Sequence, residues 1–267
     1  MTTANEERCG GAVGTACSVV TLAQRPDLQE QISQLHAETW PAFFAGDEAQ
    51  RRFWPELDSM FPDFQLVLCD ASDTVIGVGQ TIPLTWDGTV EGLPDGWDAA
   101  IVQGCREGKA GQAPNTLSAL AAVIAPSHRG RGLSSAIVRA MKAVAAEHGL
   151  GALIAPVRPT LKERYPLTPM ERYAEWHRPD GSPFDPWIRV HWRLGAATLR
   201  VSPKSMVVTG TVAEWEGWTG MEFPETGRYI VPGALQPVTI DRETDIGRYE
   251  DPNVWMRHGA EGAAAGA

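Results

Sequence analysis

One short segment brings together the residues that could bind a strongly charged ligand. Residues 127–134 (SHRGRGLS) follow an apolar run and lead into a helical pattern. The first turn of a helix has backbone N–H groups without intrahelical partners, and it carries the positive end of the helix dipole. Gly130 and Gly132 leave that backbone open to a ligand, and Arg129 and Arg131 add positive charge. The segment predicts a site for a pyrophosphate or a similar polyanion.

Two common phosphate-binding patterns do not fit this segment. The dinucleotide fingerprint needs a third glycine where Ser135 stands, and an acidic residue about twenty residues further on, which residues 150–158 do not supply. The P-loop needs Lys and then Ser or Thr after its last glycine, whereas Leu133 follows Gly132. A plain turn with two solvated arginines is the structural alternative. The apolar run before the segment and the amphipathic helix after it favour the anion site.

The segment resembles the signature of the GNAT superfamily of acyl-CoA-dependent N-acyltransferases, Arg/Gln-x-x-Gly-x-Gly/Ala. Ser134 stands at the last small position, the one departure from that pattern. The resemblance implies acetyl-CoA or another acyl-CoA as co-substrate. Backbone amides would hold its pyrophosphate, and the edge of the preceding strand would pair with its pantetheine arm. The residues thereby assigned to cofactor binding are Ala122, Val123, Ile124, Arg129, Gly130, Arg131, Gly132, Leu133 and Ser134.

A second resemblance concerns the catalytic residue. GNAT chains often carry Tyr-x-x-x-Gly-Phe, in which the Tyr protonates the departing CoA thiolate. Here His191 stands at the Tyr position, Gly195 is kept, and Ala196 replaces the Phe. The alignment implies that His191 protonates the thiolate, and an imidazole could equally accept a proton from an amine. The structural alternative is a histidine packed at a helix end and bonded to a carbonyl.

Aromatic and basic residues outside these motifs are candidates for binding the acyl acceptor. Arginine can bind a carboxylate through two parallel hydrogen bonds, and tryptophan can line a pocket for an apolar or planar molecule. Several acids could act as general base, and no feature of the sequence favours one of them. Metal-ligand spacing is absent, so no metal is expected. The substrate-binding candidates are Trp40, Trp86, Arg158 and Arg189.

The surrounding pattern predicts the elements that must position these residues. An apolar run at 116–125, a helical pattern at 131–148 and a second apolar run at 151–157 form a βαβ unit, which favours a parallel strand pair. Other helices are expected at 26–39, 47–60, 97–107 and 185–194, and other strands at 65–69, 75–83, 196–201 and 205–214.

These elements predict an α/β fold with a GNAT-like mixed central β-sheet flanked by helices and a C-terminal extension. Residues 18–215 would form the acyltransferase core, with insertions at 87–115 and 158–184. Residues 216–259 would pack on that core, and residues 229–240 are rich in strand formers. Residues 1–17 and 260–267 are expected to be disordered.

Composition limits the partners. The chain has 267 residues, with 23 Lys and Arg against 33 Asp and Glu, a formal net charge of −10. Such a balance argues against nucleic acid, which selects basic surfaces. No stretch approaches the ~20 apolar residues of a membrane span, and the N-terminus lacks the apolar run of a secretory signal. A cytoplasmic protein with four free thiols is expected, and a homodimer is allowed but not required.

The predicted reaction is transfer of an acyl group, acetyl before any other, from acyl-CoA to a small-molecule amine. The amine would attack the thioester carbonyl directly, while a strand amide near Val123 or Ile124 polarises that carbonyl. Two alternatives stay open. The core could bind acyl-CoA without turnover, as a sensor or scaffold. It could also perform other acyl-CoA chemistry, such as transfer to oxygen or decarboxylation.

Overall fold

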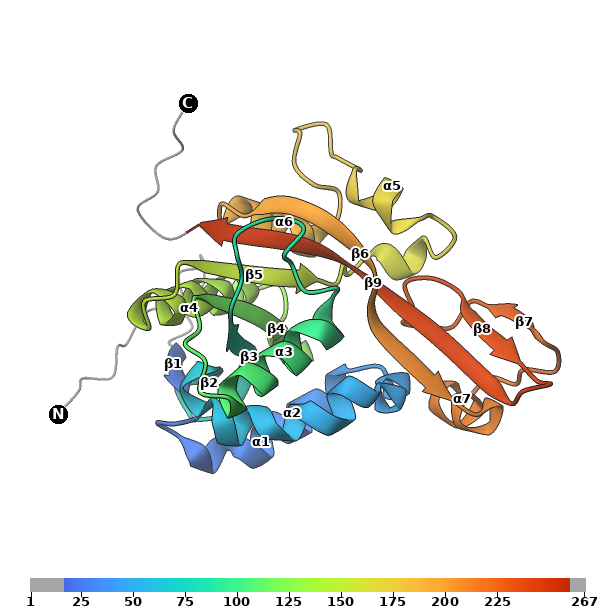
Figure 1. Ribbon diagram of the computed structural model, residues 1–267, viewed down its shortest axis with the longest axis horizontal. Coiled ribbons are helices and arrows are strands. Elements are labelled where there is room, and N and C mark those ends of the chain that lie inside the picture. Colours follow the sequence, from blue (N-terminus) through green and yellow to red (C-terminus); the bar gives the residue numbers. More distant parts are fainter. Residues whose placement is uncertain (1–16, 260–267) are drawn as a thin grey trace.

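A nine-stranded mixed sheet organises the protein. The computed structural model describes residues 17–259. The strand order is β1-β2-β3-β4-β5-β9-β8-β7, and β6 also pairs with β9 (Figure 1). The β4–β5 pair is parallel, and every other pair is antiparallel. The strands are β1 (Cys17–Thr21), β2 (Gln65–Asp70), β3 (Val75–Leu84), β4 (Thr116–Ile124), β5 (Ala152–Val157), β6 (Ala197–Gly210), β7 (Gly227–Tyr229), β8 (Val238–Asp241) and β9 (Ile246–Gly259).

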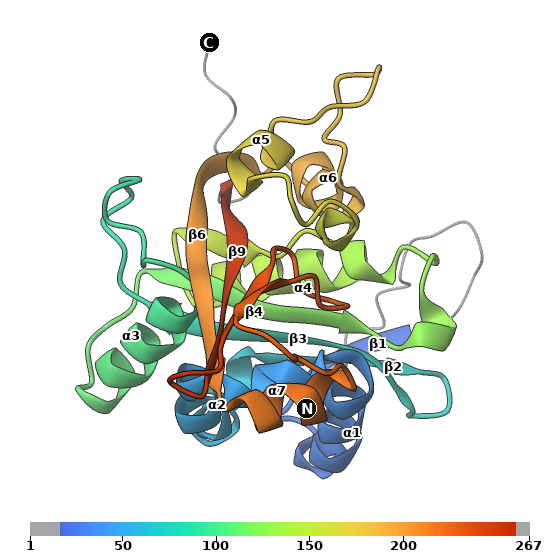
Figure 2. The same cartoon turned by 90° about the vertical axis from the view of Figure 1, so that its right-hand side faces the viewer.

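Helices cover both faces of this sheet, as the view in Figure 2 shows. One face carries α1 (Gln29–Thr39), α2 (Glu48–Met60) and α3 (Trp97–Lys109). The other carries α4 (Leu133–Glu147) and α6 (Pro186–Arg193). Two short helices complete the fold, α5 (Met170–Ala174) in the 158–184 segment and α7 (Val212–Thr219) after β6. The expected α/β architecture, with a mixed sheet flanked by helices, is confirmed.

The two parallel strands at the centre of the sheet separate along their length. Pairing between β4 and β5 is confined to Leu117 with Leu153 and Ser118 with Ile154. Beyond Ser118 the strands diverge, although β4 continues to Ile124. On its other edge β4 pairs with β3 and carries a bulge at Leu120, which increases local twist. The separation leaves backbone groups of β4 without a strand partner on the β5 side.

Helix α4 begins at the mouth of this opening. Its apolar face, which includes Ile137, Met141 and Val144, is buried against the sheet, as the 3.6-residue spacing predicts. Gly132 precedes the helix with a left-handed backbone, and no side chain caps the helix start. Gly149 ends the helix with φ +69°. Packing of this face therefore fixes the helix N-terminus beside β4.

The C-terminal third differs most from the expectation. The runs at 196–201 and 205–214 are one strand, β6, which ends at Gly210. Thr211 and Glu214 form a capping box that starts α7 where a strand was expected. Strand β9, which was not expected, lies inside the sheet between β5 and β8. Part of the segment treated as an extension is thus a central element of the core.

Three expectations concern the chain as a whole. The expected disordered ends, 1–17 and 260–267, lie outside the described residues except for Cys17, which begins β1. Cys17 is disulfide-bonded, so the expectation of four free thiols is wrong there, whereas Cys69 and Cys105 are free and buried. Within residues 17–259, no helix has both the length and the apolar character to cross a membrane.

Candidate functional site

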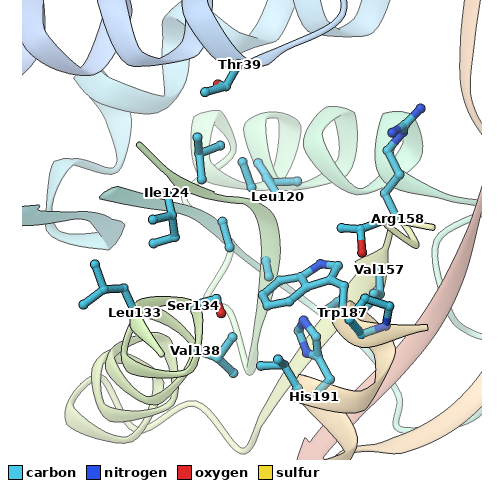
Figure 3. Close-up of a pocket in the computed structure, with 18 of the residues that line it drawn as sticks. Thr39, Leu120, Ile124, Leu133, Ser134, Val138, Val157, Arg158, Trp187 and His191 are labelled. Atoms are coloured by element: carbon cyan, nitrogen blue, oxygen red, sulfur yellow. The ribbon is translucent and has the colours of Figure 1, made fainter. Parts of the chain in front are cut away.

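A cavity of about 780 Å³ opens where β4 and β5 separate (Figure 3). Its walls come from the end of α1, the second half of β4, the loop before α4 and the first half of that helix, the end of β5, and α6, with single residues of α3, β6 and β9. Elements from both faces of the sheet meet here. The opening therefore runs between the two helical layers, with β4 along its side.

The glycine–arginine loop forms one end of the cavity. Arg129, Gly130, Gly132, Leu133 and Ser134 all line it. Both glycines have a left-handed backbone, with φ +76° and φ +79°, and a Cβ at either would meet no atom within 4 Å. Backbone conformation, not crowding, therefore requires glycine here. No side chain caps the start of α4, and Leu133 and Ser134 of its first turn line this end, as an anion site needs.

The strand edge predicted for the pantetheine arm lies along the same cavity. Ala122, Val123 and Ile124 line it, as do Ala119 and Leu120 further back along β4. Arg131 is the one residue of the predicted cofactor set outside the lining, and its guanidinium bonds to the Ser127 carbonyl at 3.3 Å. Arg131 thus stabilises the loop and does not line the cavity.

His191 forms part of the cavity wall beside Trp187 (Figure 3). The residue is 2% exposed, and its ring lies edge-on to the Trp187 indole with centroids 4.4 Å apart. Its Nδ1 is 2.9 Å from Nε2 of His258 on β9, and its Nε2 has no hydrogen-bond partner among the described residues. Burial and the neighbouring His258 lower the pKa of His191 to about 3. The imidazole is therefore neutral at pH 7.

Arg158 lines the cavity near its other end, just after β5. Its Nε lies 2.9 Å and 3.1 Å from the two carboxylate oxygens of Asp251, and its Nη2 donates to the Gly233 carbonyl at 2.6 Å. Asp251 is fully buried and also accepts from the Tyr249 hydroxyl and the Asn253 amide. The Asp251 carboxylate thus holds the Arg158 guanidinium in place, and the guanidinium balances the negative charge of the carboxylate.

Aromatic side chains line the cavity on the side of α1 and α3. Trp40 and Trp97 contribute to the lining from the α1 and α3 layer. The Trp97 indole donates to the Leu120 carbonyl at 2.7 Å, at the bulge of β4, and stacks on Trp54 with centroids 5.8 Å apart. Trp97 is therefore held rigidly, with its polar atom satisfied.

Two predicted acceptor-binding residues lie outside the cavity lining. Trp86 is buried in the core, with its indole N–H bonded to the Thr89 carbonyl at 2.8 Å. Arg189 donates to the carbonyls of Pro183 and Phe184 at 2.7 Å and 2.9 Å. Both side chains stabilise the local structure of a loop.

Sequence reasoning missed the residues that β9 contributes. His258, Asp251 and Asn253 were not expected at the site because β9 was not expected as a strand. His258 had no spacing signal, since it is 67 residues from its partner. Within residues 17–259 no group of His, Cys, Asp and Glu is arranged to hold a metal ion.

Comparison with known proteins agrees with this geometry. The Acetyltransferase (GNAT) family model matches residues 30–168. "Arginine N-acetyltransferase avaD" of Aspergillus versicolor is 31% identical over 272 residues, which cover 90% of this chain and 93% of that protein.

Two solved structures share the fold. The loading GNATL domain of CurA from Lyngbya majuscula matches with a TM-score of 0.56 and 14% identity, over 92% of this chain and 98% of that one. The GphF GNAT-like decarboxylase in complex with isobutyryl-CoA matches with a TM-score of 0.55 and 17% identity, over 92% and 99%. With the sequence matches, these findings show that the chain belongs to the GNAT acetyltransferase family and is an N-acyltransferase that takes its acyl group from acyl-CoA.

Proposed function

We propose that the protein transfers an acetyl group from acetyl-CoA to the primary amine of arginine or a close derivative of arginine. One observation carries the proposal: a single cavity joins an anion-binding loop, a buried histidine, and an arginine anchored by a buried carboxylate. A relative named for arginine acetylation, 31% identical across nearly the whole chain, supports the choice of acceptor. Use of acyl-CoA also supports a cytoplasmic location.

Arg158 supplies the group that would recognise the acceptor's carboxylate. Its Nε and Nη2 are engaged within the protein, while Nη1 has no hydrogen bond to the described residues. The side chain is 29% exposed, so the guanidinium edge can reach a ligand. A carboxylate there would receive a charge-assisted hydrogen bond, stronger than one between neutral groups.

The acceptor's own guanidinium would lie against aromatic faces. The described lining residues include no Asp or Glu, but they include Trp40, Trp97 and Trp187. A planar cation stacks favourably on an indole, with an attraction of about 0.5–2 kcal/mol. The guanidinium stays protonated at neutral pH, whereas an α-amino group has a much lower pKa than a guanidinium and supplies a neutral nitrogen far more readily. The α-amine is therefore the nitrogen that attacks.

The reaction needs one proton moved from nitrogen to sulfur. The amine attacks the thioester carbonyl, a C–N bond forms, and backbone amides of β4 stabilise the oxyanion. Collapse of the intermediate breaks the C–S bond. Neutral His191 accepts the proton that the nitrogen loses and delivers it to the CoA thiolate, because the negative charge of oxyanion and thiolate favours its protonated form. His191 thus combines the two roles that the sequence suggested, proton donor to the thiolate and proton acceptor from the amine.

An assay of the products tests this proposal. The protein is incubated with acetyl-CoA and L-arginine, and acetylarginine and free CoA are measured by mass spectrometry. Agmatine, which lacks the carboxylate, and Nα-blocked arginine serve as comparison substrates. We expect acetylation of arginine, weaker acetylation of agmatine and none of the blocked compound.

Two variants separate cofactor binding from catalysis. Gly130→Glu places a carboxylate where the pyrophosphate would lie, and calorimetry should show loss of acetyl-CoA binding. His191→Ala should keep acetyl-CoA affinity and lose turnover. Full turnover in His191→Ala contradicts the catalytic role. Tight acetyl-CoA binding with no acetylated product from any arginine derivative contradicts the proposed acceptor.

A further inference from the structure

His258 is a second buried histidine that faces the first. It lies near the end of β9, is fully buried, and places its Nε2 2.9 Å from Nδ1 of His191, which comes from α6. Two nitrogens at this distance must share a hydrogen, because two lone pairs or two N–H groups would repel each other. One ring therefore donates and the other accepts.

Both rings are neutral, so two arrangements of protons are available. Burial lowers the pKa of His191 to about 3 and that of His258 to about 4. In the first arrangement His191 donates from Nδ1, and its Nε2 faces the cavity as a bare lone pair. In the second, His258 donates from Nε2, and His191 then carries its proton on Nε2. Only the first arrangement gives the cavity a proton acceptor.

The proposed chemistry at the cavity requires the first arrangement. His191 lines the cavity, and its Nε2 has no hydrogen-bond partner among the described residues, nor does Nδ1 of His258. A proton acceptor at the cavity needs a bare Nε2, so the proton of the neutral His191 ring must be on Nδ1. His258 must then accept that proton's hydrogen bond through its own Nε2.

We propose that His258 is a positioning residue that holds His191 in the tautomer with its proton on Nδ1, so that Nε2 faces the acyl-transfer site as a proton acceptor. The inference rests on the proposed role of His191 as the shuttle. When His191 Nε2 takes the amine's proton, the ring becomes a cation with both nitrogens protonated, and His258 Nε2 keeps accepting from Nδ1. Delivery of the proton to the thiolate restores the starting tautomer.

Other charged groups do not upset this arrangement. His258 and the edge of Trp187 are the contacts that flank the His191 ring, and neither carries a charge at neutral pH. Lys142 of α4 acts on His258, where its positive charge disfavours a second positive charge. The pair therefore stays neutral and keeps one tautomer between pH 6 and pH 8.

Nitrogen-15 NMR of protein labelled at histidine tests the tautomer directly, because bare and protonated ring nitrogens resonate far apart. We expect His191 Nε2 to appear bare and Nδ1 protonated in the wild-type protein, without change from pH 6 to pH 8. His191→Gln assigns the signals. A protonated His191 Nε2 in the wild-type protein overturns the proposal.

Two variants of His258 test its effect on catalysis. In His258→Leu the acceptor is lost, and His191 should shift toward the Nε2-protonated tautomer, with kcat lower by about 10-fold or more and KM for acetyl-CoA unchanged. In His258→Gln an amide oxygen can accept the same hydrogen, and most of the turnover should return. The positioning role is wrong if His258→Leu keeps both the wild-type tautomer of His191 and the wild-type kcat. It is also wrong if a folded His258→Gln loses as much kcat as His258→Leu.

Failure of the proposed function would look different. Full turnover in His191→Ala removes the catalytic role but leaves the wild-type tautomer measurement as it stands. A wild-type tautomer opposite to the expected one removes the positioning role even where His191→Ala is inactive. If His258→Leu does not fold, the wild-type spectrum and the kcat of His258→Gln still test the positioning role of His258.

Discussion

The contact between Arg158 and Asp251 predicts a loss of stability that can be separated from a loss of substrate binding. Arg158→Met removes the guanidinium and leaves the Asp251 carboxylate, which is 0% exposed, with only the Tyr249 hydroxyl and the Asn253 amide. Breaking a buried ion pair in this way costs about 3–5 kcal/mol, because an uncompensated charge stays buried. We expect urea unfolding at pH 7 to show this loss.

The double variant Arg158→Met/Asp251→Asn removes the buried charge as well. Its Asn side chain can still accept from Tyr249, so most of the lost stability should return. The thermodynamic cycle, with Asp251→Asn as its fourth corner, should give a coupling energy of about 2–3 kcal/mol for groups in direct contact. The double variant is then the stable background in which to measure binding.

In that background, substrate binding should show the role of the guanidinium. A hydrogen bond to a charged group contributes about 1.5–3 kcal/mol. The kcat/KM of the double variant for L-arginine should therefore fall below the wild-type value on the order of 10- to 100-fold. Agmatine has no carboxylate, and its kcat/KM should change little. Initial rates of CoA release at 25 °C measure both. An equal fall for both substrates, or an unchanged value for arginine, refutes the assignment of Arg158 to the carboxylate.

Three further predictions concern the loop, the proton and the α2–α3 contact. Gly132→Ala must hold an L-residue at φ +79°, a cost of about 1–2 kcal/mol, so calorimetry should show acetyl-CoA affinity about 10-fold lower, and an unchanged Kd argues against the loop. Because His191 has a pKa of about 3, kcat/KM should rise with pH as the substrate's amine loses its proton and show no inflection at the ordinary histidine pKa of about 6.5. Burial and the charge of Asp47 raise the pKa of Asp98 from 3.8 to about 9, so the folded state keeps a proton that the unfolded state releases, and stability falls as pH rises from about 4 to about 9. Asp98→Asn, whose oxygen can still accept from the Val207 N–H, should remove that fall and unfold at higher urea than wild type at pH 8.

The cofactor end of the cavity could be predicted because its residues are neighbours in sequence. The strand before the loop, the two glycines and the apolar face of α4 lie within about one βαβ unit, and local rules govern each. Gly130 and Gly132 are needed for their backbone conformation, which a short motif records directly. The acyl-CoA assignment followed from that segment alone.

The acceptor end could not be predicted because its contacts join distant residues. Arg158 and Asp251 are 93 residues apart in sequence, and no periodicity links them. Sequence also cannot distinguish a tryptophan of the cavity from one of the core. Trp86 precedes and Trp97 follows the same turn-rich segment, yet of these two only Trp97 lines the cavity.

Strand β9 was missed for a local reason. Pro252 lies within it, and a proline demotes a run to an edge strand or a loop. The structure accommodates Pro252 because the pairing with β6 is irregular between Ser202 and Met206, and the pairing with β5 begins only at Val254. The proline therefore interrupts no regular ladder, although the strand on either side is central.

This one strand connects the two halves of the site across the sheet. Side chains alternate along a strand, so Asp251 and Asn253 share a face with Trp255, which belongs to the core beneath α2 and α3. His258 shares the opposite face with Val254 and Met256, which pack toward α4 and α6.

The Arg158–Asp251 contact and the histidine pair therefore depend on a single register. A slip of one residue would send every one of these side chains to the wrong face. Pairing of Val254 with Val157 on one side and with Val201 on the other opposes such a slip. Because both ladders fix the same register, a weakening of β9 should impair acceptor binding and proton transfer together, while the loop before α4 keeps its affinity for acetyl-CoA.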